Sequence, residues 1–356
     1  GYREELYNNK LTPPPPLVPR DRRVVVKERT DASGNVVLAL DKQSLASAVD
    51  ALVAAQVQAV AICFMHSHAN PVHEQLAKAM VQERLPNTYL TVSSELLPQA
   101  RFYERLSTAA LNSYVGPILK RYLDSLQANL ARIGFKGVLL IMQSNGGVAT
   151  PESTAKTAVM TLLSGPAGGP VAGLVFTGVQ GYDQCITVDM GGTSFDASVV
   201  QRGVPLLRSE GWIARQRLAL PMLDIHTIGA GGGSIGWIDD GGLLRMGPQS
   251  AGAQPGPACY GRGGELPTCT DANLVLGYLE PDYFLGGRMK LDREAARRAI
   301  ETHIAKPLGI SVEQAAAGMF HVVNVNMAAG LREITVSRGI DPREYPLVVA
   351  GGAGPI

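Results

Sequence analysis

Between residues 42 and 94, apolar residues follow alternating helix-like and strand-like patterns. They recur every three or four positions over 45–53, and QAVAICFM at 58–65 is a continuous apolar run typical of a buried strand. A second helix is predicted after Asn70-Pro71, and TYLTVSS at 88–94 favours another strand. Helices that alternate with strands in this way predict parallel strands joined by crossover helices.

The pattern changes near residue 105. A long helix is predicted beyond it, because apolar residues recur at steps of four and three: Leu119, Leu123, Leu126, Leu130 and Ile133. Gly116-Pro117 is expected to break or kink the first part of this helix, and Gly134 to end it. GVLLIM at 137–142 then predicts a buried strand. We therefore predict two domains, at residues 1–105 and 106–356.

The stretch ITVDMGGTSFDASVV at 186–200 places two glycines between two β-branched runs, which predicts a hairpin. Two further helices are predicted at 292–304 and 312–332, begun by an aspartate and a serine respectively. A final strand and glycine turn, YPLVVAGGAGPI, occupies 345–356. The whole pattern predicts an α/β protein with many tight turns.

Composition narrows the class of protein. The 356 residues are 46% hydrophobic and 18% charged, with 32 basic and 31 acidic residues. This near-neutral balance argues against binding to nucleic acid or to a membrane surface. The four cysteines form no C-x-x-C pair and no apolar run is long enough to span a bilayer, so we expect a soluble, cytoplasmic protein. The chain starts at Gly and its last strand and turn look unfinished, so we expect a piece of a longer chain.

The glycine hairpin carries groups that suit a phosphate ligand. Gly191-Gly192 lets backbone N–H groups approach an anion with no Cβ in the way. Thr193-Ser194 adds hydroxyl donors, and Asp189 could hold a hydrated Mg²⁺. Asp196 could orient a water or ligate a second metal. A plain Gly-Gly hairpin with solvated acids accounts for the same residues, and the motif alone does not separate the two interpretations.

Further stretches complete a resemblance to a known family. VDMGGTSFDASVV resembles the second phosphate motif of the actin-like ATPase superfamily. More narrowly, the chain resembles the hydantoinase A/5-oxoprolinase family, which includes N-methylhydantoinase subunits and acetone carboxylase β subunits. The supporting stretches are RLSTAALNSYVGPI, MQSNGGV, SGPAGG, DIHTIGAGGGSI, PGPACYGRGGELPTCTDANLVLGYL and LVVAGGAGP. Together they cover nearly the whole chain.

The resemblance implies a fold. Such proteins bind ATP between two ribonuclease-H-like lobes, whose mixed sheets are flanked by helices, and each lobe starts with a glycine hairpin. This chain has a single D-x-G-G-T-x-x-D motif, at 189–196, so the first phosphate hairpin is missing. SGPAGG at 164–169 is expected to pack beside the remaining hairpin, although a role in close helix packing alone is an equal alternative.

The resemblance also implies site residues and cofactors. Gly191, Gly192, Thr193 and Ser194 would contact the phosphates of ATP. Asp189 would lie near Mg²⁺, and Gly351 and Gly352 would approach the adenosine.

The implied function is that of a component of an ATP-dependent cyclic amide hydrolase of the hydantoinase/5-oxoprolinase type. ATP would phosphorylate the oxygen of a lactam or amide, because resonance makes an amide a poor electrophile. A hydantoinase B-type subunit or domain would complete ring opening, and we expect an oligomer. The rival interpretations are an ATP-dependent ketone carboxylase subunit of the acetone carboxylase type and a non-catalytic nucleotide-binding module.

Asp224 and His226 precede a glycine loop in MLDIHTI. Because they lie two residues apart on a predicted strand, their side chains share one face. We interpret them, together with Asp196, as catalytic residues for acid–base chemistry. A buried, hydrogen-bonded pair is the alternative interpretation.

Two motif matches in the glycine loop are interpreted as accidental. GGSIG at 232–236 fits the nucleophile-elbow pattern G-x-S-x-G through Ser234, and with Gly231 it fits G-x-G-x-x-G. Both patterns require a helix next, whereas a strand is predicted there.

Other polar residues are interpreted mainly as structural. His66, His68 and His73 could bind Zn²⁺, although a surface turn is the favoured interpretation. Asp271 is predicted to be a helix N-cap rather than to face the cleft. Cys259 is predicted to be a packed thiol, since no basic residue adjoins it.

Overall fold

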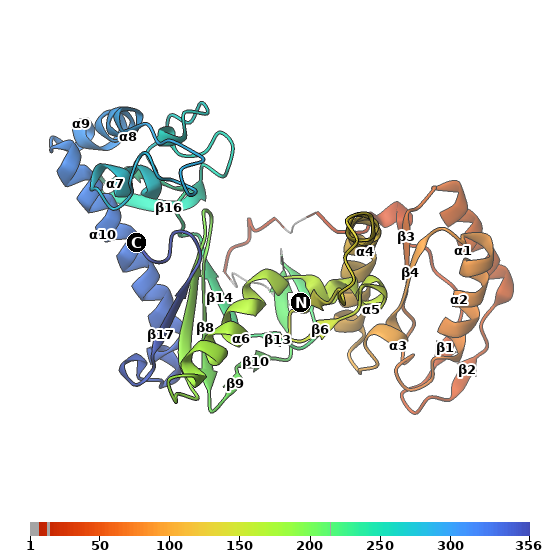
Figure 1. The fold of residues 1–356 in the computed structure, drawn as a ribbon. Coiled ribbons are helices and arrows are strands. Elements are labelled where there is room, and N and C mark those ends of the chain that lie inside the picture. Colours follow the sequence, from red (N-terminus) through yellow and green to blue (C-terminus); the bar gives the residue numbers. More distant parts are fainter. Residues whose placement is uncertain (1–6, 13–14, 214) are drawn as a thin grey trace. The chain divides into compact units, whose positions relative to one another are not determined.

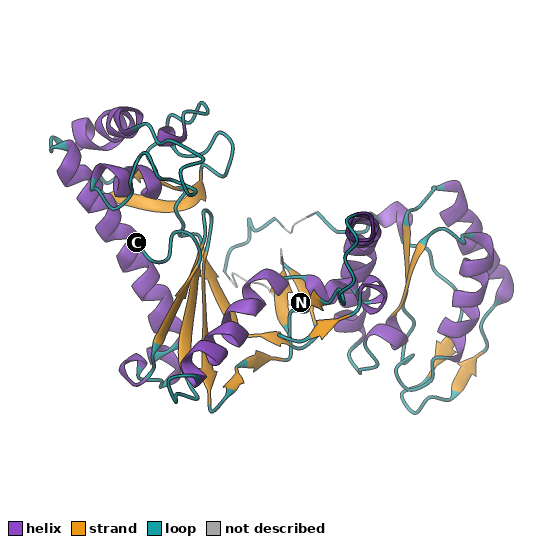
Figure 2. Cartoon of the chain, in the orientation of Figure 1, coloured by secondary structure: helices purple, strands orange, loops and turns teal. Residues whose placement is uncertain are grey.

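The computed structural model describes residues 7–12, 15–213 and 215–356 (Figure 1). The chain forms two compact units. Unit 1 comprises Gly1–Ser164 and Arg208–Met222, and unit 2 comprises Gly165–Leu207 and Leu223–Ile356. Both units mix helices with strands, as Figure 2 shows. The predicted domain boundary near residue 105 stays a prediction.

Unit 1 contains the predicted parallel strand pair. Strands β3 (Ala59–Ile62) and β4 (Tyr89–Val92) pair in parallel, and α2 (Val72–Arg84) lies between them in the sequence. Helix α1 (Lys42–Ala54) begins where the side chain of Asp41 accepts a hydrogen bond from the N–H of Gln43. The apolar residues that predicted these elements form one core: Leu45, Val49, Leu52, Val60, Ile62, Ala77 and Val81. The helix–strand alternation is therefore confirmed.

The long helix α4 spans Phe102–Arg132 without interruption. The helix does not break at Gly116-Pro117, because α4 continues through Pro117. The kink that is the alternative prediction stays a prediction. At Gly116 the ring of Tyr89 packs so closely that a Cβ there would lie 2.2 Å from its Cε1 atom, so this glycine serves a tertiary contact. Gly134 has a φ of 75° directly after the helix and ends it as predicted.

The prediction of a buried strand at 137–142 is wrong. Only Ile141–Met142 form a strand, β5, which pairs with the two-residue strand β6 (Val148–Ala149). Val138 is 80% exposed and Leu140 is 48% exposed. An apolar run predicts burial only where another layer covers it, and nothing in the described part of the chain covers this one.

Shorter elements complete unit 1, and two strands lie where the chain passes between the units. The unit 1 elements are η1 (Arg20–Arg22), β1 (Arg29–Thr30), β2 (Val36–Leu38), α3 (Ser93–Leu96), α5 (Pro151–Lys156), η2 (Ala158–Thr161), β11 (Gly211–Ile213) and β12 (Gln216–Leu218). The crossing strands are β10 (Leu207–Arg208) and β13 (Met222–Leu223).

Unit 2 is built on a mixed five-stranded sheet. Its main order is β14 (Ile225–Ile228), β8 (Phe195–Gln201), β7 (Cys185–Met190) and β17 (Leu347–Ala350). The fifth strand, β9 (Val204–Pro205), pairs antiparallel with the end of β8. β8 is antiparallel to both β7 and β14, whereas β17 runs parallel to β7. The predicted hairpin and final strand are therefore confirmed, and both end beside the same turn.

The two faces of this sheet differ in chemistry because side chains alternate along each strand. Helix α10 (Val312–Ile334) packs on the apolar face, where Ile186, Val188, Phe195 and Ala197 join the main core with Met319 and Val323. Helix α6 (Ser164–Gly178) lies on the other face. That face carries Thr187, Asp189, Asp196 and Ser198.

The rest of unit 2 begins with the hairpin of β15 (Ser234–Ile238) and β16 (Leu244–Ser250). The elements that follow are η3 (Ala258–Tyr260), α7 (Cys269–Val275), α8 (Arg293–Ile300), the π-helical η4 (Glu301–Ala305), α9 (Lys306–Leu308), η5 (Val336–Arg338) and η6 (Pro342–Glu344). Asp292 caps α8, and Ser311 forms a capping box with Gln314 at α10, so both predicted helix starts are confirmed. Among the described residues, no helix is both long enough and apolar enough to cross a membrane.

Gly173 of α6 gives a direct test of the packing between helix and sheet. A Cβ at this position would lie 2.3 Å from Cγ2 of Thr187, so we expect Gly173→Ala to lower the free energy of unfolding by about 1–3 kcal/mol. Gly168→Ala is the matched control, because its Cβ would meet no atom within 4 Å and alanine favours the helix by up to about 1 kcal/mol. Urea unfolding measures both changes, and equal stability of the two variants would contradict this packing.

Candidate functional site

The turn of the β7–β8 hairpin exposes backbone donors. The N–H of Gly191 donates to the carbonyl of Ser194 at 3.2 Å and closes the turn. The N–H groups of Gly192 and Thr193 donate no hydrogen bond to any described residue. A Cβ at Gly191 or Gly192 would meet no atom within 4 Å. The turn therefore presents free N–H groups beside open space, which is the arrangement that an anion requires.

Two carboxylates lie at the base of this turn. Asp189 and Asp196 are direct partners across the antiparallel pair, so both side chains lie on the α6 face. Asp196 accepts hydrogen bonds from the hydroxyls of Ser194, at 3.1 Å, and Thr227. The Asp189 carboxylate has no hydrogen-bond or ion-pair partner among the described residues.

Like charges directly opposite each other destabilise a sheet. The two hydroxyls at Asp196 offset one of these charges, whereas the charge at Asp189 is left without a partner, so the pair favours a bound cation. No group of three or more His, Cys, Asp or Glu in the described chain could hold a metal by itself. A cation here fits only an ion that takes most of its ligands from water or from a bound anion, as Mg²⁺ does.

The glycine loop at 229–233 supports the turn from behind. The N–H of Gly232 donates to the carbonyl of Gly191 at 3.0 Å, and the N–H of Gly233 donates to that of Gly192 at 2.7 Å. A Cβ at Gly231 would lie 2.7 Å from the backbone of Gly192 and Thr193. These glycines therefore fix the position of the turn carbonyls, which leaves the N–H side of the turn facing outward.

The structure around Ser234 fits neither of the two motifs that the loop matches. Ser234 starts strand β15 rather than a helix, as predicted. Its hydroxyl oxygen accepts a hydrogen bond from the N–H of Gly231 at 2.8 Å, and the residue is 1% exposed. It is therefore a buried structural serine and not an exposed nucleophile.

The terminal glycine turn joins the same site. The N–H of Ala353 donates to the carbonyl of Met190 at 3.0 Å. Gly351 has a φ of 85°, and a Cβ there would lie 2.4 Å from Oδ1 of Asp189, so only glycine fits. A Cβ at Gly352 would meet no atom within 4 Å. Hydrogen bonding and the parallel β7–β17 pairing therefore bring Gly351 and Gly352 beside the hairpin turn.

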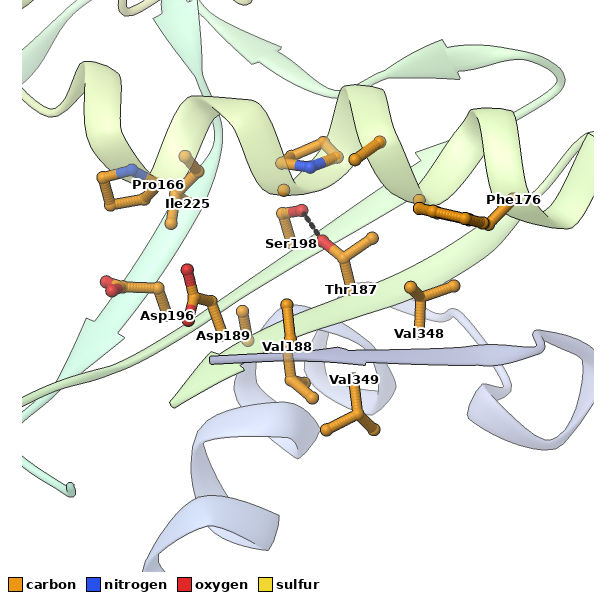
Figure 3. A pocket seen from close by; sticks show the side chains of 16 residues that line it. Pro166, Phe176, Thr187, Val188, Asp189, Asp196, Ser198, Ile225, Val348 and Val349 are labelled. Atoms are coloured by element: carbon orange, nitrogen blue, oxygen red, sulfur yellow. Dashed lines mark hydrogen bonds between the residues drawn. The ribbon is translucent and has the colours of Figure 1, made fainter. Parts of the chain in front are cut away.

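A cavity of about 320 Å³ lies between α6 and the sheet (Figure 3). Its polar groups are the carboxylates of Asp189 and Asp196 and the paired hydroxyls of Thr187 and Ser198, whose oxygens lie 2.7 Å apart. Its apolar wall is formed by residues of α6, β7, β8, β14 and β17: Pro166, Gly169, Pro170, Ala172, Gly173, Phe176, Val188, Ala197, Ile225, Val348, Val349 and Ala350. The cavity thus begins at the two acids and continues along an apolar helix.

Asp224 and His226 are not brought together with Asp196. His226 pairs with Ala197 across the sheet, so its side chain lies on the opposite face from Asp196. There its Nε2 lies 3.6 Å from a carboxylate oxygen of Glu333 in α10. Asp224 forms an ion pair with Arg338. Their catalytic assignment stays a prediction, and the ion pairs favour the alternative of a structural pair.

The three histidines of unit 1 do not converge. His73 lies on α2, where its Nδ1 is 2.8 Å from Glu28 and its Nε2 accepts the N–H of Leu40. His66 and His68 lie in the turn after β3, with ring centroids 6.0 Å apart. Desolvation, with help from the charge of Arg105, lowers the pKa of His68. The surface turn is confirmed for His66 and His68, whereas His73 is buried in the unit 1 core.

Cys259 and Asp271 form part of the unit 2 interior. The carboxylate of Asp271 accepts the N–H groups of Ala258, Cys259 and Thr268. Burial and this neighbouring carboxylate raise the pKa of the Cys259 thiol, so it is a packed thiol as predicted. The prediction of Asp271 as an N-cap is wrong, because Thr268 caps α7 and Asp271 is its capping-box partner.

Sequence reasoning missed Thr227, which fixes Asp196, and the supporting role of the Gly231–Gly233 backbone. Alternation along MLDIHTI places Thr227 on the other face from His226, so the signal was present in the sequence. The sequence does not show that this strand pairs with β8, and that pairing decides which face carries the acids.

Known proteins match nearly the whole chain. The caprolactamase subunit alpha of Pseudomonas jessenii is 44% identical over 99% of this chain and 51% of its own length. The crystal structure of the ATP-dependent caprolactamase from that organism superposes with a TM-score of 0.83, over 99% of this chain and 51% of that one. A nucleotide-free acetone carboxylase structure gives a TM-score of 0.84 at 33% identity, over 98% of this chain and 50% of that one. A 5-oxoprolinase of Saccharomyces cerevisiae is 35% identical over 94% of this chain and 26% of its own.

These matches show that the chain is related to these proteins and shares their mixed α/β fold. The chain spans about half the length of the caprolactamase and acetone carboxylase chains that it matches. The family model for the hydantoinase/oxoprolinase N-terminal region matches residues 1–85, and that for hydantoinase/oxoprolinase matches residues 105–356. The chain therefore belongs to the hydantoinase/oxoprolinase family.

Proposed function

We propose that this chain provides the nucleotide-binding part of an ATP-dependent hydrolase that opens cyclic amides. One observation carries the proposal: an unpartnered carboxylate, Asp189, lies beside a glycine turn whose N–H groups are free among the described residues. A turn of this kind suits phosphate, and the carboxylate suits the cation that accompanies phosphate. The matched relatives include an ATP-dependent caprolactamase and a 5-oxoprolinase, both named for cyclic amides.

The described residues fit Mg²⁺ and ATP. The N–H groups of Gly192 and Thr193, with the hydroxyl of Thr193, would bind the phosphates. The hydroxyl of Ser194, which the sequence also assigns to phosphate, donates its one proton to Asp196 instead. Gly191 keeps this side of the turn open, and Asp189 would hold Mg²⁺ through its free carboxylate. Gly351 and Gly352, which lie beside Asp189, would approach the adenosine.

The reaction requires a means of activating an amide, because resonance makes its carbonyl a poor electrophile. ATP, when bound, supplies the phosphoryl group that removes this resonance. The protein's own contribution is to place the acceptor and to manage a proton. Asp196 is held by Thr227 and Ser194, so its carboxylate has a fixed orientation from which it can accept a proton or orient water.

Several wider assignments belong to this proposal. We propose that unit 2 is one lobe of the actin-like ATPase type. It is supported by the antiparallel run β7, β8 and β14 and by the late strand β17, which returns in parallel beside β7. A partner subunit of the hydantoinase B type also remains a proposal, supported by relatives that are named as subunits. A cytoplasmic location stays a proposal as well.

Two alternatives keep support. The similarity to acetone carboxylase favours ATP-dependent carboxylation of a ketone on the same nucleotide site. A nucleotide-binding module without catalysis is favoured by the single glycine hairpin of this chain.

Substrate-dependent ATP hydrolysis separates the three functions. The assembled enzyme is assayed with a lactam, with a hydantoin and with acetone plus bicarbonate. We expect ATP hydrolysis to depend on the cyclic amides. Stimulation by ketone plus bicarbonate alone would show the carboxylase, and tight Mg·ATP binding without turnover on any substrate would show the module.

Asp189→Ala tests the cation site. We expect it to lower ATP turnover by at least about 100-fold, because the lost ligand leaves Mg²⁺ without its protein anchor. Calorimetric titration should show that Mg·ATP binds more weakly, while metal-free ATP binds at least as tightly as before because a repelling carboxylate is gone. Asp183→Ala is the matched control, since Asp183 is exposed and precedes the same strand. Near-normal turnover in Asp189→Ala would refute the assignment.

Thr227→Val tests the fixed orientation of Asp196. The change keeps the shape of the side chain and removes a hydrogen bond to a charged group, which is worth about 1.5–3 kcal/mol. We expect kcat to fall about 10- to 100-fold while KM for ATP is unchanged. Thr227→Ser keeps the hydroxyl and should restore turnover. A loss of thermal stability equal in the two variants, with equal activity, would argue that Thr227 is only structural.

A further inference from the structure

The cavity between α6 and the sheet has the size and lining of a small-molecule site. Its volume of about 320 Å³ lies at the lower end of the range of ligand pockets, roughly 300–1,000 Å³. Asp189 and Asp196 lie at one end of it, and it continues past Val348 of β17 towards Phe176 of α6. A mostly apolar pocket with a few polar groups at one end is typical of sites that orient a small ligand.

The charges of the lining restrict the ligand. Among the described residues around this cavity, Asp189 and Asp196 are charged and none is basic. The hydroxyls of Thr187 and Ser198 are hydrogen-bonded to each other, with their oxygens 2.7 Å apart, so one of their two protons is already used. With Mg²⁺ held at Asp189, the carboxylate of Asp196 still has only hydroxyl partners among the described residues, so it would repel an anionic ligand. A neutral ring that carries an N–H donor would instead find carboxylate acceptors at the acidic end of the cavity and apolar surface along the rest of it.

The position of the cavity connects it to the reaction. Asp189 and Asp196 belong both to its lining and to the turn that we assign to phosphate. A group held at the acidic end of the cavity therefore lies at the same two carboxylates as the nucleotide site. This is where a phosphoryl acceptor is needed.

We propose that this cavity binds the cyclic amide substrate, and that it selects uncharged lactams over lactams that carry a carboxylate. The inference rests on the proposed function and adds to it a substrate class and a place of binding. The ring lies against the apolar wall formed by α6 and Val348, and the amide end faces Asp189 and Asp196.

Two ligands that differ by one group test the selectivity. 2-Pyrrolidinone and 5-oxoproline share the same five-membered lactam ring, and only the second carries a carboxylate. With the assembled enzyme, we expect lactam-dependent ATP hydrolysis to show a kcat/KM at least tenfold higher for 2-pyrrolidinone. Equal or higher kcat/KM for 5-oxoproline would overturn the inference and leave the proposed hydrolase intact.

Gly169→Leu tests the place of binding. A Cβ at Gly169 would lie 3.9 Å from Oγ1 of Thr187, so a larger side chain there enters the cavity. Leucine favours the helix more than glycine does, so the variant should fold. We expect KM for 2-pyrrolidinone to rise at least tenfold while KM for ATP is unchanged. Gly168→Leu is the matched control on the same helix, because Gly168 does not line the cavity and its Cβ meets no atom within 4 Å.

The other outcomes are equally decisive. An increase in KM for ATP in Gly169→Leu would show that the cavity holds part of the nucleotide, and an unchanged KM for 2-pyrrolidinone would show that the lactam binds elsewhere. Saturation-transfer NMR of 2-pyrrolidinone without ATP gives a readout independent of turnover. Binding that is present in the unaltered protein and lost in Gly169→Leu supports the site even if the proposed hydrolase fails, and binding retained in the variant overturns it.

Discussion

The site depends on one backbone contact, the close approach of the glycine loop at 229–233 to the hairpin turn. Two N–H groups of the loop, from Gly232 and Gly233, bind the carbonyls of Gly191 and Gly192. Because these carbonyls are satisfied from behind, the turn does not need to rotate to pair them, and its own N–H groups stay outward. A Cβ at Gly231 or Gly233 would overlap the turn backbone, so the contact requires glycine at these loop positions.

The strand pairings then bring the chemistry to this turn. β8 sets Asp196 opposite Asp189, β14 brings Thr227 against Asp196, and β17 brings Gly351 against Asp189. The side chains on one face of the sheet are polar and lie under α6, whereas those on the other face form the core under α10. A single sheet thus separates the reactive groups from the apolar core that stabilises them.

The same separation gives a reason to interpret Asp224 and His226 as structural. His226 lies on the α10 side with its Nε2 3.6 Å from Glu333, and Asp224 forms an ion pair with Arg338. A charged residue that faces the core side of a sheet needs such a partner, since an unpaired buried charge is costly. Asp189, which has no partner among the residues that the structure describes, lies instead on the side that carries the cavity.

Periodicity and capping residues were enough to predict most elements. The helices that begin after Asp292 and Ser311 form where these capping residues indicate, because a cap acts within one turn of helix. Helix α1 forms where apolar spacing alone predicts it. Two failures have long-range causes. The helix continues through Pro117 against the packed ring of Tyr89, and the apolar run at 137–142 finds no covering layer in the described chain.

The sequence by itself determined the glycine hairpin, its acids and hydroxyls, and their resemblance to a phosphate motif, since these are local features of residue type and order. Only the tertiary structure decided which acid is free, which face each candidate occupies and where a small molecule can bind. Those answers depend on which strands pair and in what register, and a shift of one residue in register moves every side chain to the opposite face.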